Sequence, residues 1–598
     1  MKYEVYILKT THMDFIINSV TNGVKMLKVV KNATFLIAVF LSAHCRAKTN
    51  RRKLELLLSN VREVKILKEK LNMLKYVKDL KLGYSDAQNY TQRGNKAMLS
   101  NVFVKNSYLD DLLEPSVYFL IGEKGTGKTA YAAFLSNNEY NGERSVLKYI
   151  SGTDYEKFYE LKSSNKIDIS GYVDIWKTIL LLLLAKSITD DDKVVSTFNR
   201  TNLDKLIDAI DDYYNKAFSP EIINALKIVD DSEMAAKIVC KYVEVGGETV
   251  KSHEFTEQRL QMNLYYIFKK FADCLGKLKL NRNLTLFIDG IDIRPSQIPY
   301  NDYLNCIKGL ANACWSLNTE LFANVRDSKG HLKIVLLLRP DIFNSLNLQN
   351  ATTKLADNSV YLEWRTTYTD YPTSNLYKMA NKLLAYDQNI NIDEIDIWEQ
   401  YFDWKLKSSN PKLRNYDTAF MEFLRISLSR PRDIQTILKY QQDFMKRKGV
   451  GSNQKFNYSI YSSDEFQNAY SEYFLGSLKD QLSFYYSEDD FRHFRKFFDF
   501  FQTPDFTFEE YKKAYDSFVN YIMDNANDIP KFVEDPKIFL QLLYDCNVIA
   551  AIENGGRYIH FSYREKTTTN INPEVMYDES ISYRFHYGLY KKTRMGRY

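Results

Sequence analysis

Apolar residues along this chain gather in short uninterrupted runs that are separated by longer amphipathic stretches. Runs of about four to eight apolar residues are typical of strands buried on both faces of a parallel sheet. Between the runs, apolar residues recur at helical spacing, which predicts an α/β fold whose parallel sheet is covered by helices on both faces. The predicted strands are Val117–Ile121, Val146–Ile150, Leu284–Ile288, Ile334–Leu338 and Val360–Leu362.

Helical periodicity dominates most of the remaining chain. In residues 51–82, leucines and valines three and four positions apart alternate with Lys and Arg, which predicts a surface-packing or coiled-coil helix. Residues 153–280 have a mostly helical pattern, and Ile175–Ile188 is their most apolar stretch. Residues 366–448 also have a mainly helical pattern.

The last part of the chain changes pattern near its end. Residues 462–548 are rich in aromatic side chains at helical spacing. Two apolar runs then flank Asn554–Gly556, and this sequence predicts a β-hairpin. Helices followed by such a hairpin resemble a winged-helix unit. Asn89–Asn95, by contrast, is interpreted as a linker.

Charge is unevenly distributed along the chain. The net charge is +6, but residues 1–100 contain 19 Lys and Arg against 7 Asp and Glu, so the remainder carries −6. A basic arm on an acidic body suits binding to nucleic acid, to an anionic membrane or to an acidic partner. A solvated helix rich in lysine explains the same asymmetry.

Cysteine usage and hydropathy indicate a cytoplasmic protein. The six cysteines have no CxxC spacing, which favours reduced thiols over disulfides or a zinc site. The apolar stretch Ala33–Ala43 is shorter than the roughly 20 residues that cross a bilayer. It suits a buried helix or an interfacial anchor, and we do not expect a membrane protein.

One octapeptide carries specific chemistry. It matches the phosphate-binding pattern G-x-x-x-x-G-K-[ST] in full, with a predicted strand before it and a predicted helix after it. Backbone N–H groups of such a loop converge on phosphate oxygens, and the following helix adds the positive end of its dipole. The residues are Gly122, Glu123, Lys124, Gly125, Thr126, Gly127, Lys128 and Thr129.

The octapeptide predicts a site for ATP and Mg²⁺. We expect Lys128 to reach the β- and γ-phosphates and the Thr129 hydroxyl to ligate Mg²⁺. Asp289 ends the predicted strand Leu284–Ile288, so its carboxylate is expected opposite Thr129, where it helps to hold the metal ion.

The residues after Asp289 carry a family resemblance. The string FIDGIDIRP, with Gly290 and Asp292, resembles the acid-Gly-x-acid form of the STAND class of signal-transduction ATPases, which is related to AAA+ and origin-recognition ATPases. Arg339, in IVLLLRPD, resembles the sensor position of that class, and Ser429–Asp433 resembles its lid. The chain also looks like a bacterial group of largely uncharacterised P-loop ATPases, some of them in phage-defence systems. The resemblance covers about residues 105–445.

The resemblance gives some residues expected roles, each with a structural alternative. Asp292 activates water or is a hydrogen-bonded structural acid. Arg339 senses the γ-phosphate or caps a strand end. Arg430 and Arg432 reach the nucleotide from the lid, or one of them pairs with an acid, Asp433 or Glu422.

Three further residues lie in loops close to these motifs in the sequence. Arg294 is a candidate finger for a neighbouring subunit, although a solvated loop arginine is favoured. Asp154 is a weaker candidate, and the neighbouring Tyr155 is expected to pack.

The expected architecture has four parts. They are a basic helical arm (1–100), a P-loop ATPase core (101–365) with a helical insertion at about 153–282, a helical lid (366–450) and a helical, winged-helix-like C-terminal domain (451–598). The predicted function is a STAND-like molecular switch in bacterial defence or signalling. It hydrolyses ATP slowly because Gly290 replaces the Glu that many P-loop ATPases place after the acid. A homo-oligomer and an effector protein are the expected partners.

The main alternative is a DNA-acting ATPase of the origin-recognition or transposition-helper type, which would bind duplex DNA. A scaffold that binds nucleotide without hydrolysing it is a third interpretation.

Overall fold

The computed structural model of the chain separates into two compact units, Met1–Leu74 and Lys75–Tyr598. The described helices and strands belong to the second unit. The structure describes residues 74–151, 155–156, 159, 171–191, 193–195, 200–216, 257–388, 390–393, 395–407, 416–553 and 558–590. The apolar stretch Ala33–Ala43, most of the basic arm and Asp154 lie outside these residues.

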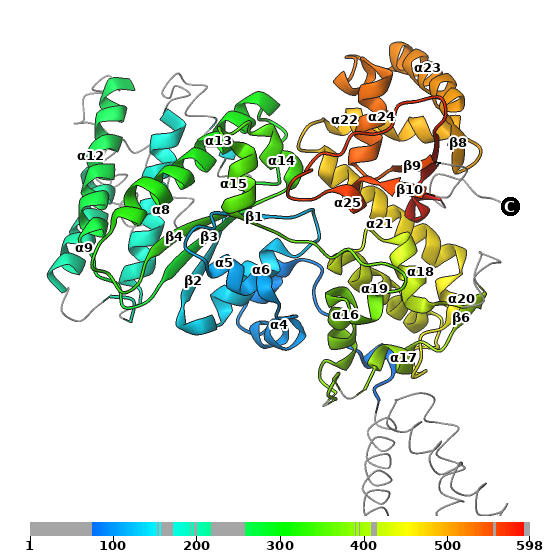
Figure 1. Cartoon of the computed structure of the whole chain (residues 1–598), viewed down its shortest axis with the longest axis horizontal. Helices are drawn as coiled ribbons and strands as arrows, with labels where there is room; N and C mark the ends of the chain where they lie inside the picture. Colours follow the sequence, from blue (N-terminus) through cyan, green and yellow to red (C-terminus); the bar gives the residue numbers. More distant parts are fainter. Residues whose placement is uncertain are drawn as a thin grey trace, which may run out of the picture. The chain divides into compact units, whose positions relative to one another are not determined.

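A five-stranded sheet lies at the centre of the α/β part (Figure 1). Its strand order is β2-β3-β4-β1-β5, and every neighbouring pair is parallel. This sheet confirms the predicted α/β class and all five predicted strands, with shifts of one or two residues at most ends. The strands are β1 Phe119–Ile121, β2 Arg144–Tyr149, β3 Leu284–Asp289, β4 Leu332–Leu338 and β5 Ser359–Tyr361.

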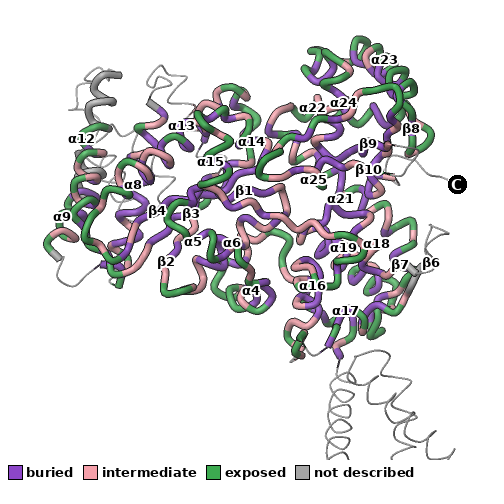
Figure 2. Tube along the Cα trace, in the orientation of Figure 1, coloured by how far each residue is buried: buried purple, intermediate pink, exposed green. Residues whose placement is uncertain are grey.

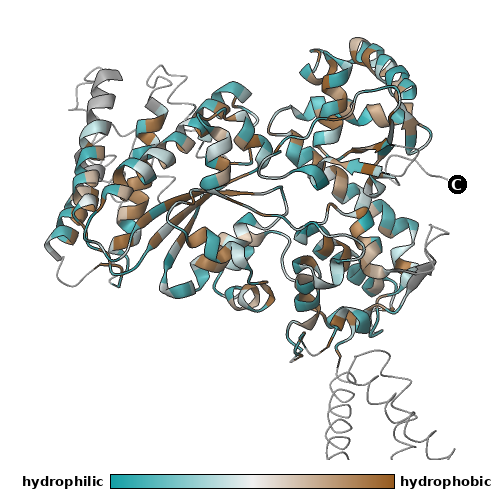
Figure 3. Ribbon diagram, viewed as in Figure 1, coloured by the Kyte–Doolittle hydropathy of each residue, from teal (hydrophilic) through white to brown (hydrophobic). Residues whose placement is uncertain are grey.

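Alternate residues of the central strands face two separate apolar cores. In β4, Leu336 packs in one core and Leu337 in the other, as the two-residue period of a strand requires. The three inner strands β3, β4 and β1 are therefore buried throughout, and Figures 2 and 3 show them as buried and apolar.

Helices cover both faces of the sheet. The smaller core is formed with helices α4 Lys96–Val102, α5 Ser107–Leu113 and α6 Lys128–Asn137. The larger core is formed with helices α8 Gly171–Thr189, α9 Arg200–Lys216, α12 Glu257–Gly276, α13 Tyr300–Ser316, α14 Pro340–Ser345 and α15 Ala351–Asp357.

Within the range of the predicted helical insertion, the described elements include the helices α8, α9 and α12. Helix α8 contains the most apolar stretch of the sequence, and residues 179–185 are almost fully buried. Its neighbours are α12 and α13. Burial inside the core therefore accounts for its composition. Within the described part of the chain, no helix has the length and apolar content needed to cross a membrane.

Residues 366–450 are mainly helical, as predicted. Side chains at the helix starts accept backbone hydrogen bonds, such as Ser374 from Tyr377 N and Thr418 from Met421 N. The short antiparallel pair β6–β7 was not predicted. The elements are α16 Asn375–Ala385, α17 Ile397–Tyr401, β6 Lys405–Lys407, β7 Tyr416–Thr418, α18 Ala419–Ile426 and α19 Pro431–Arg447.

The predicted helix at 51–82 is wrong over its last residues. After Lys75 the chain forms only the 3-10 turn Val77–Asp79 and then continues extended. Gln442 donates hydrogen bonds to Val77 O and Leu80 O, so tertiary contacts take the carbonyls that a helix would use. The predicted linker is also wrong, because its first part lies in the 3-10 helix Ala87–Thr91.

The C-terminal part combines helices with a four-stranded antiparallel sheet of order β10-β9-β11-β8. The pairing of β9 with β10 confirms the hairpin, whose turn lies outside the described residues. Strands β8 and β11 were not predicted. The elements are α20 Tyr458–Tyr461, α21 Asp464–Leu482, α22 Glu488–Lys496, β8 Asp505–Thr507, α23 Phe508–Asn525, α24 Pro536–Asp545, β9 Ile549–Glu553, β10 Tyr558–Phe561, α25 Ser562–Glu565 and β11 Ser582–Phe585.

Candidate functional site

The octapeptide forms a loop between the end of β1 and the start of α6. Gly125 and Gly127 have φ values of 90° and 96°, in the left-handed region that favours glycine. A Cβ on Gly122 would lie 2.5 Å from Thr126 Oγ1, so this position also excludes a side chain. The spacing of the glycines therefore matches what the loop conformation requires.

Two residues far apart in sequence meet at the end of this loop. Thr129 Oγ1 donates a 2.6 Å hydrogen bond to Asp289 Oδ2, and Gly290 N donates one of 2.8 Å to Asp289 Oδ1. Burial raises the pKa of the Asp289 carboxyl, while the hydrogen bond from Thr129 opposes that rise. The predicted placement of Asp289 opposite Thr129 is thus present in the structure.

Lys128 lies inside the loop with a side chain that is almost fully buried. Its Nζ donates a 2.8 Å hydrogen bond to Gly122 O and lies 3.4 Å from Asp292 Oδ2. The other carboxylate oxygen, Asp292 Oδ1, is buried and has no hydrogen-bond partner among the described residues. Asp292 therefore lies beside the loop with one carboxylate oxygen that no described group hydrogen-bonds.

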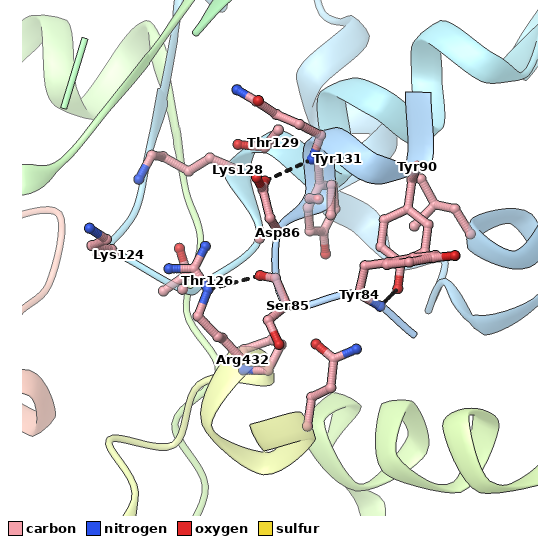
Figure 4. Close-up of a pocket in the computed structure, with 18 of the residues that line it drawn as sticks. Tyr84, Ser85, Asp86, Tyr90, Lys124, Thr126, Lys128, Thr129, Tyr131 and Arg432 are labelled. Atoms are coloured by element: carbon pink, nitrogen blue, oxygen red, sulfur yellow. Dashed lines mark hydrogen bonds between the residues drawn. The ribbon is translucent and has the colours of Figure 1, made fainter. Parts of the chain in front are cut away.

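A cavity of about 350 Å³ opens beside the loop (Figure 4). It is lined by Lys124–Thr129, Asp289, Asp292 and Arg432. Gly122 and Glu123, predicted as binding residues, do not line it. The segment Tyr84–Gln88 does.

Sequence reasoning missed the segment Tyr84–Gln88 because nothing in its residue types marks a ligand site. The chain is held there by tertiary contacts. Arg432 Nε donates to Ser85 O at 3.1 Å, and the Tyr90 hydroxyl accepts a 2.9 Å hydrogen bond from Tyr84 N. Only the fold brings this segment to the loop.

The donor set fits Mg²⁺ that is shared with a phosphate ligand. A threonine hydroxyl and a carboxylate are hard oxygen donors, and Mg²⁺ in nucleotide sites commonly uses one or two such groups with waters and phosphates. Across the described residues, no group of three or more His, Cys, Asp or Glu side chains is placed to hold a metal ion alone. Thr129 and Asp289 therefore fit a metal ion that arrives with a nucleotide.

Arg430 is engaged by an acid, which is one of its predicted alternatives. Its Nε and a terminal nitrogen each lie 3.0 Å from an Asp433 oxygen. The second terminal nitrogen donates to Lys124 O at 2.8 Å. Arg430 thus holds the backbone of the loop from outside the cavity.

Arg432 has a different position from Arg430. Its side chain lines the cavity, and its backbone N donates to Gly125 O at 3.4 Å. Of the two arginines, Arg432 is the one placed to meet a ligand.

Arg339, at the predicted sensor position, does not line the cavity. Its guanidinium is fully buried and donates to both carboxylate oxygens of Asp341, at 3.0 and 2.6 Å. Burial alone would raise the pKa of Asp341, but the charge and hydrogen bonds of Arg339 lower it to about 2. The ion pair is therefore charged, and the guanidinium donates to Asp341 and to Gln481 O rather than lining the cavity.

The two remaining candidates have structural contacts. Arg294 is half-buried and donates to Phe484 O at 2.8 Å and to Ile298 O at 2.6 Å, so it is not a solvated loop arginine. Tyr155 is buried and packs edge-on against Tyr303, as expected.

Comparison with models of known protein families finds no match for this chain. Comparison with curated protein sequences also finds none.

Two side chains of the loop contact the C-terminal part. Glu123 forms a 2.7 Å ion pair with Lys566, whose side chain is buried, and Lys124 forms one of 2.8 Å with Asp480. Two of the four variable positions in the phosphate-binding pattern thus form ion pairs with the C-terminal part.

Asp545, close to Lys566, gives a pH-dependent prediction. Burial raises the pKa of its carboxyl from 3.8 to about 6, against the charge of Lys566 and a hydrogen bond from Gln541. Because the folded pKa exceeds the unfolded one, the stability that this group adds at low pH is lost as the pH rises through about 6. Asp545→Asn is expected to raise the free energy of unfolding by about 2 kcal/mol near neutral pH and to leave it unchanged at about pH 4.

Urea unfolding of the full chain at the two pH values measures this difference. Asp524→Asn, at an exposed position of α23, is the matched control and should change neither value. A variant of Asp545 that is equally destabilised at both pH values would show that the buried charge is not the cause.

Proposed function

We propose that this protein is a Mg²⁺-dependent switch that binds and hydrolyses ATP. The observation that carries the proposal is the 2.6 Å hydrogen bond between Thr129 and Asp289, which are 160 residues apart. A glycine loop alone is a weak signal. A loop whose threonine meets a buried strand-end carboxylate has the two protein groups that a nucleotide-bound Mg²⁺ requires.

Each residue of the site has a distinct task in this proposal. Lys128 exchanges its hydrogen bond to Gly122 O for phosphate oxygens. Thr129 and Asp289 hold Mg²⁺, which neutralises phosphate charge when it is bound. Asp292 accepts the proton of the attacking water through Oδ1, which has no hydrogen-bond partner in the described part of the chain, because its other oxygen faces Lys128.

The contacts around the loop support a switch. Arg430 holds the loop backbone, and Lys566 and Asp480 hold two of its side chains. A ligand that rearranges the loop would strain these contacts and bias the placement of the helical lid and the C-terminal domain. We propose a STAND-like role in bacterial defence or signalling, with a homo-oligomer or an effector protein as its output.

Steady-state hydrolysis of Mg²⁺-ATP by the purified protein tests this function. We expect fewer than about one turnover per second, because Gly290 replaces the glutamate that orients water in faster ATPases. Turnover well above that rate in the protein alone would contradict the slow switch. Absence of ATP binding would contradict the site itself.

A DNA-acting ATPase is the second candidate. The hairpin β9–β10, whose strand β9 contacts helix α24, supports it, because winged-helix units of this kind bind duplex DNA. The charge of this region opposes it, since residues 487–590 contain 18 Asp and Glu against 11 Lys and Arg. Duplex DNA that stimulates hydrolysis in a salt-sensitive manner, with loss of the effect on deletion of residues 1–73, would favour this candidate over the switch.

A further inference from the structure

The segment Gln481–Tyr485 lies at and beyond the end of helix α21 and contacts two loops of the α/β core. Phe484 O accepts a 2.8 Å hydrogen bond from Arg294, in the loop after β3. Gln481 O accepts one of 3.2 Å from Arg339, in the loop after β4. The Tyr485 hydroxyl donates to Asp341 at 2.9 Å. Both core loops begin at the edge of the sheet where the phosphate-binding loop lies.

Phe484 inserts its ring into the core of the α/β part. The side chain is fully buried and belongs to the larger apolar core on one face of the sheet. Its ring lies edge-on to Tyr303, with 5.6 Å between centroids, and edge-on to Tyr300 at 5.9 Å. Both tyrosines belong to helix α13. Phe484 therefore adds a buried ring from beyond α21 to the core on the sheet, against which Tyr485 and Ile571 also pack.

Tyr303 also contacts the loop Gly290–Arg294, which is called the acidic loop here because it contains Asp292. Its hydroxyl lies 2.9 Å from Ile291 O and 3.0 Å from Ile293 O, the carbonyls on either side of Asp292. Burial raises the pKa of Tyr303 well above its usual value, so the hydroxyl keeps its proton and remains a donor. The Asp292 side chain has only Lys128 within ion-pair distance, and its Oδ1 has no hydrogen-bond partner among the described residues. The position of Asp292 thus depends on the backbone that Tyr303 holds.

We propose that Tyr303 and Phe484 are positioning residues for Asp292, so that the segment after α21 completes the ATP site. This inference rests on the proposed ATPase function. Removing the hydroxyl of Tyr303 removes its hydrogen bonding to the carbonyls on either side of Asp292. The aromatic ring stays in the core. Removing the ring of Phe484 leaves Tyr303 without its neighbour from the C-terminal part.

The decisive variant is Tyr303→Phe, with Tyr300→Phe as its matched control. Tyr300 is on the same helix and contacts the same Phe484 ring, but its hydroxyl is paired with Ser345 rather than with the acidic loop. Phe484→Leu, which keeps an apolar side chain, is the second variant. All are made in the full chain and compared by hydrogen exchange of the loop Gly290–Arg294, by ATP affinity and by turnover.

We expect Tyr303→Phe to speed amide exchange in this loop by roughly tenfold and to lower turnover by a similar factor, with ATP affinity unchanged. Phe484→Leu should show the same pattern more weakly, and Tyr300→Phe should match the parent. In the background of Asp292→Asn, Tyr303→Phe should cause no additional loss of turnover, because it acts through Asp292.

Unchanged exchange in Tyr303→Phe would overturn the inference. So would a loss of turnover that multiplies with that of Asp292→Asn. Because exchange is measured without nucleotide, a parent protein that binds but does not hydrolyse ATP would refute the proposed hydrolysis and still allow the exchange data to decide whether Tyr303 holds the loop.

Discussion

Replacement of Lys128 by alanine is expected to reduce ATP turnover on the order of 100-fold. Loss of one preorganised group that stabilises transition-state charge typically costs that much. Lys128 already lies inside the loop, because the residue is only 6% exposed and its Nζ donates to Gly122 O at 2.8 Å. Asp292, at 3.4 Å, adds a second contact that keeps the ammonium inside the loop.

Steady-state hydrolysis compares this variant with the parent and with Lys279→Ala. Lys279 is exposed and lies outside the cavity, so its replacement should leave turnover unchanged. If Lys128→Ala keeps more than about a tenth of the parent rate, the measured hydrolysis does not come from this loop.

Replacement of Gly290 by alanine is expected to destabilise the fold by roughly 3 kcal/mol or more. Gly290 has φ +94°, and a Cβ there would lie 2.1 Å from Ile150 O. The clash is with backbone, so no side-chain rotation relieves it. Because Gly290 N also holds Asp289 Oδ1, relaxation of the clash would displace the proposed metal ligand.

Thermal and urea unfolding of the full chain measure this effect. Gly276→Ala is the matched control, because Gly276 ends helix α12 and a Cβ there would meet nothing within 4 Å. Its replacement should leave stability unchanged or raise it slightly. Equal stability of the two variants would show that the backbone at Gly290 is not constrained as described.

The sequence predicts the α/β part well because its signals are local. Strands buried on both faces must be continuously apolar, so β3 and β4 are visible as runs such as LTLFI and IVLLL. The phosphate-binding loop is visible because its glycines are required by backbone conformation at fixed positions. Asp289 is found because it ends an apolar strand in a chain that already contains the loop.

The parts that sequence does not predict depend on distant partners. Glu123 and Lys566 are 443 residues apart, and Lys124 and Asp480 are 356 apart. No local pattern distinguishes such side chains from solvated ones. The same holds for the 3-10 turn at Val77–Asp79, where Val77 O accepts a hydrogen bond from Gln442 of α19. The sequence also does not show which group Arg339 binds. Its guanidinium pairs with Asp341, two residues further along the chain, rather than with a ligand.

Titration of the full chain with ATP, with and without Mg²⁺, tests the central claim most directly. The structure predicts one binding site per chain that requires Mg²⁺ for full affinity and is lost in Lys128→Ala. Asp289→Asn should weaken the Mg²⁺ dependence while leaving some metal-free binding, because the loop itself is intact. Binding that is equal in the parent and in Lys128→Ala, or no binding at all, would contradict the assignment of this loop as a nucleotide site.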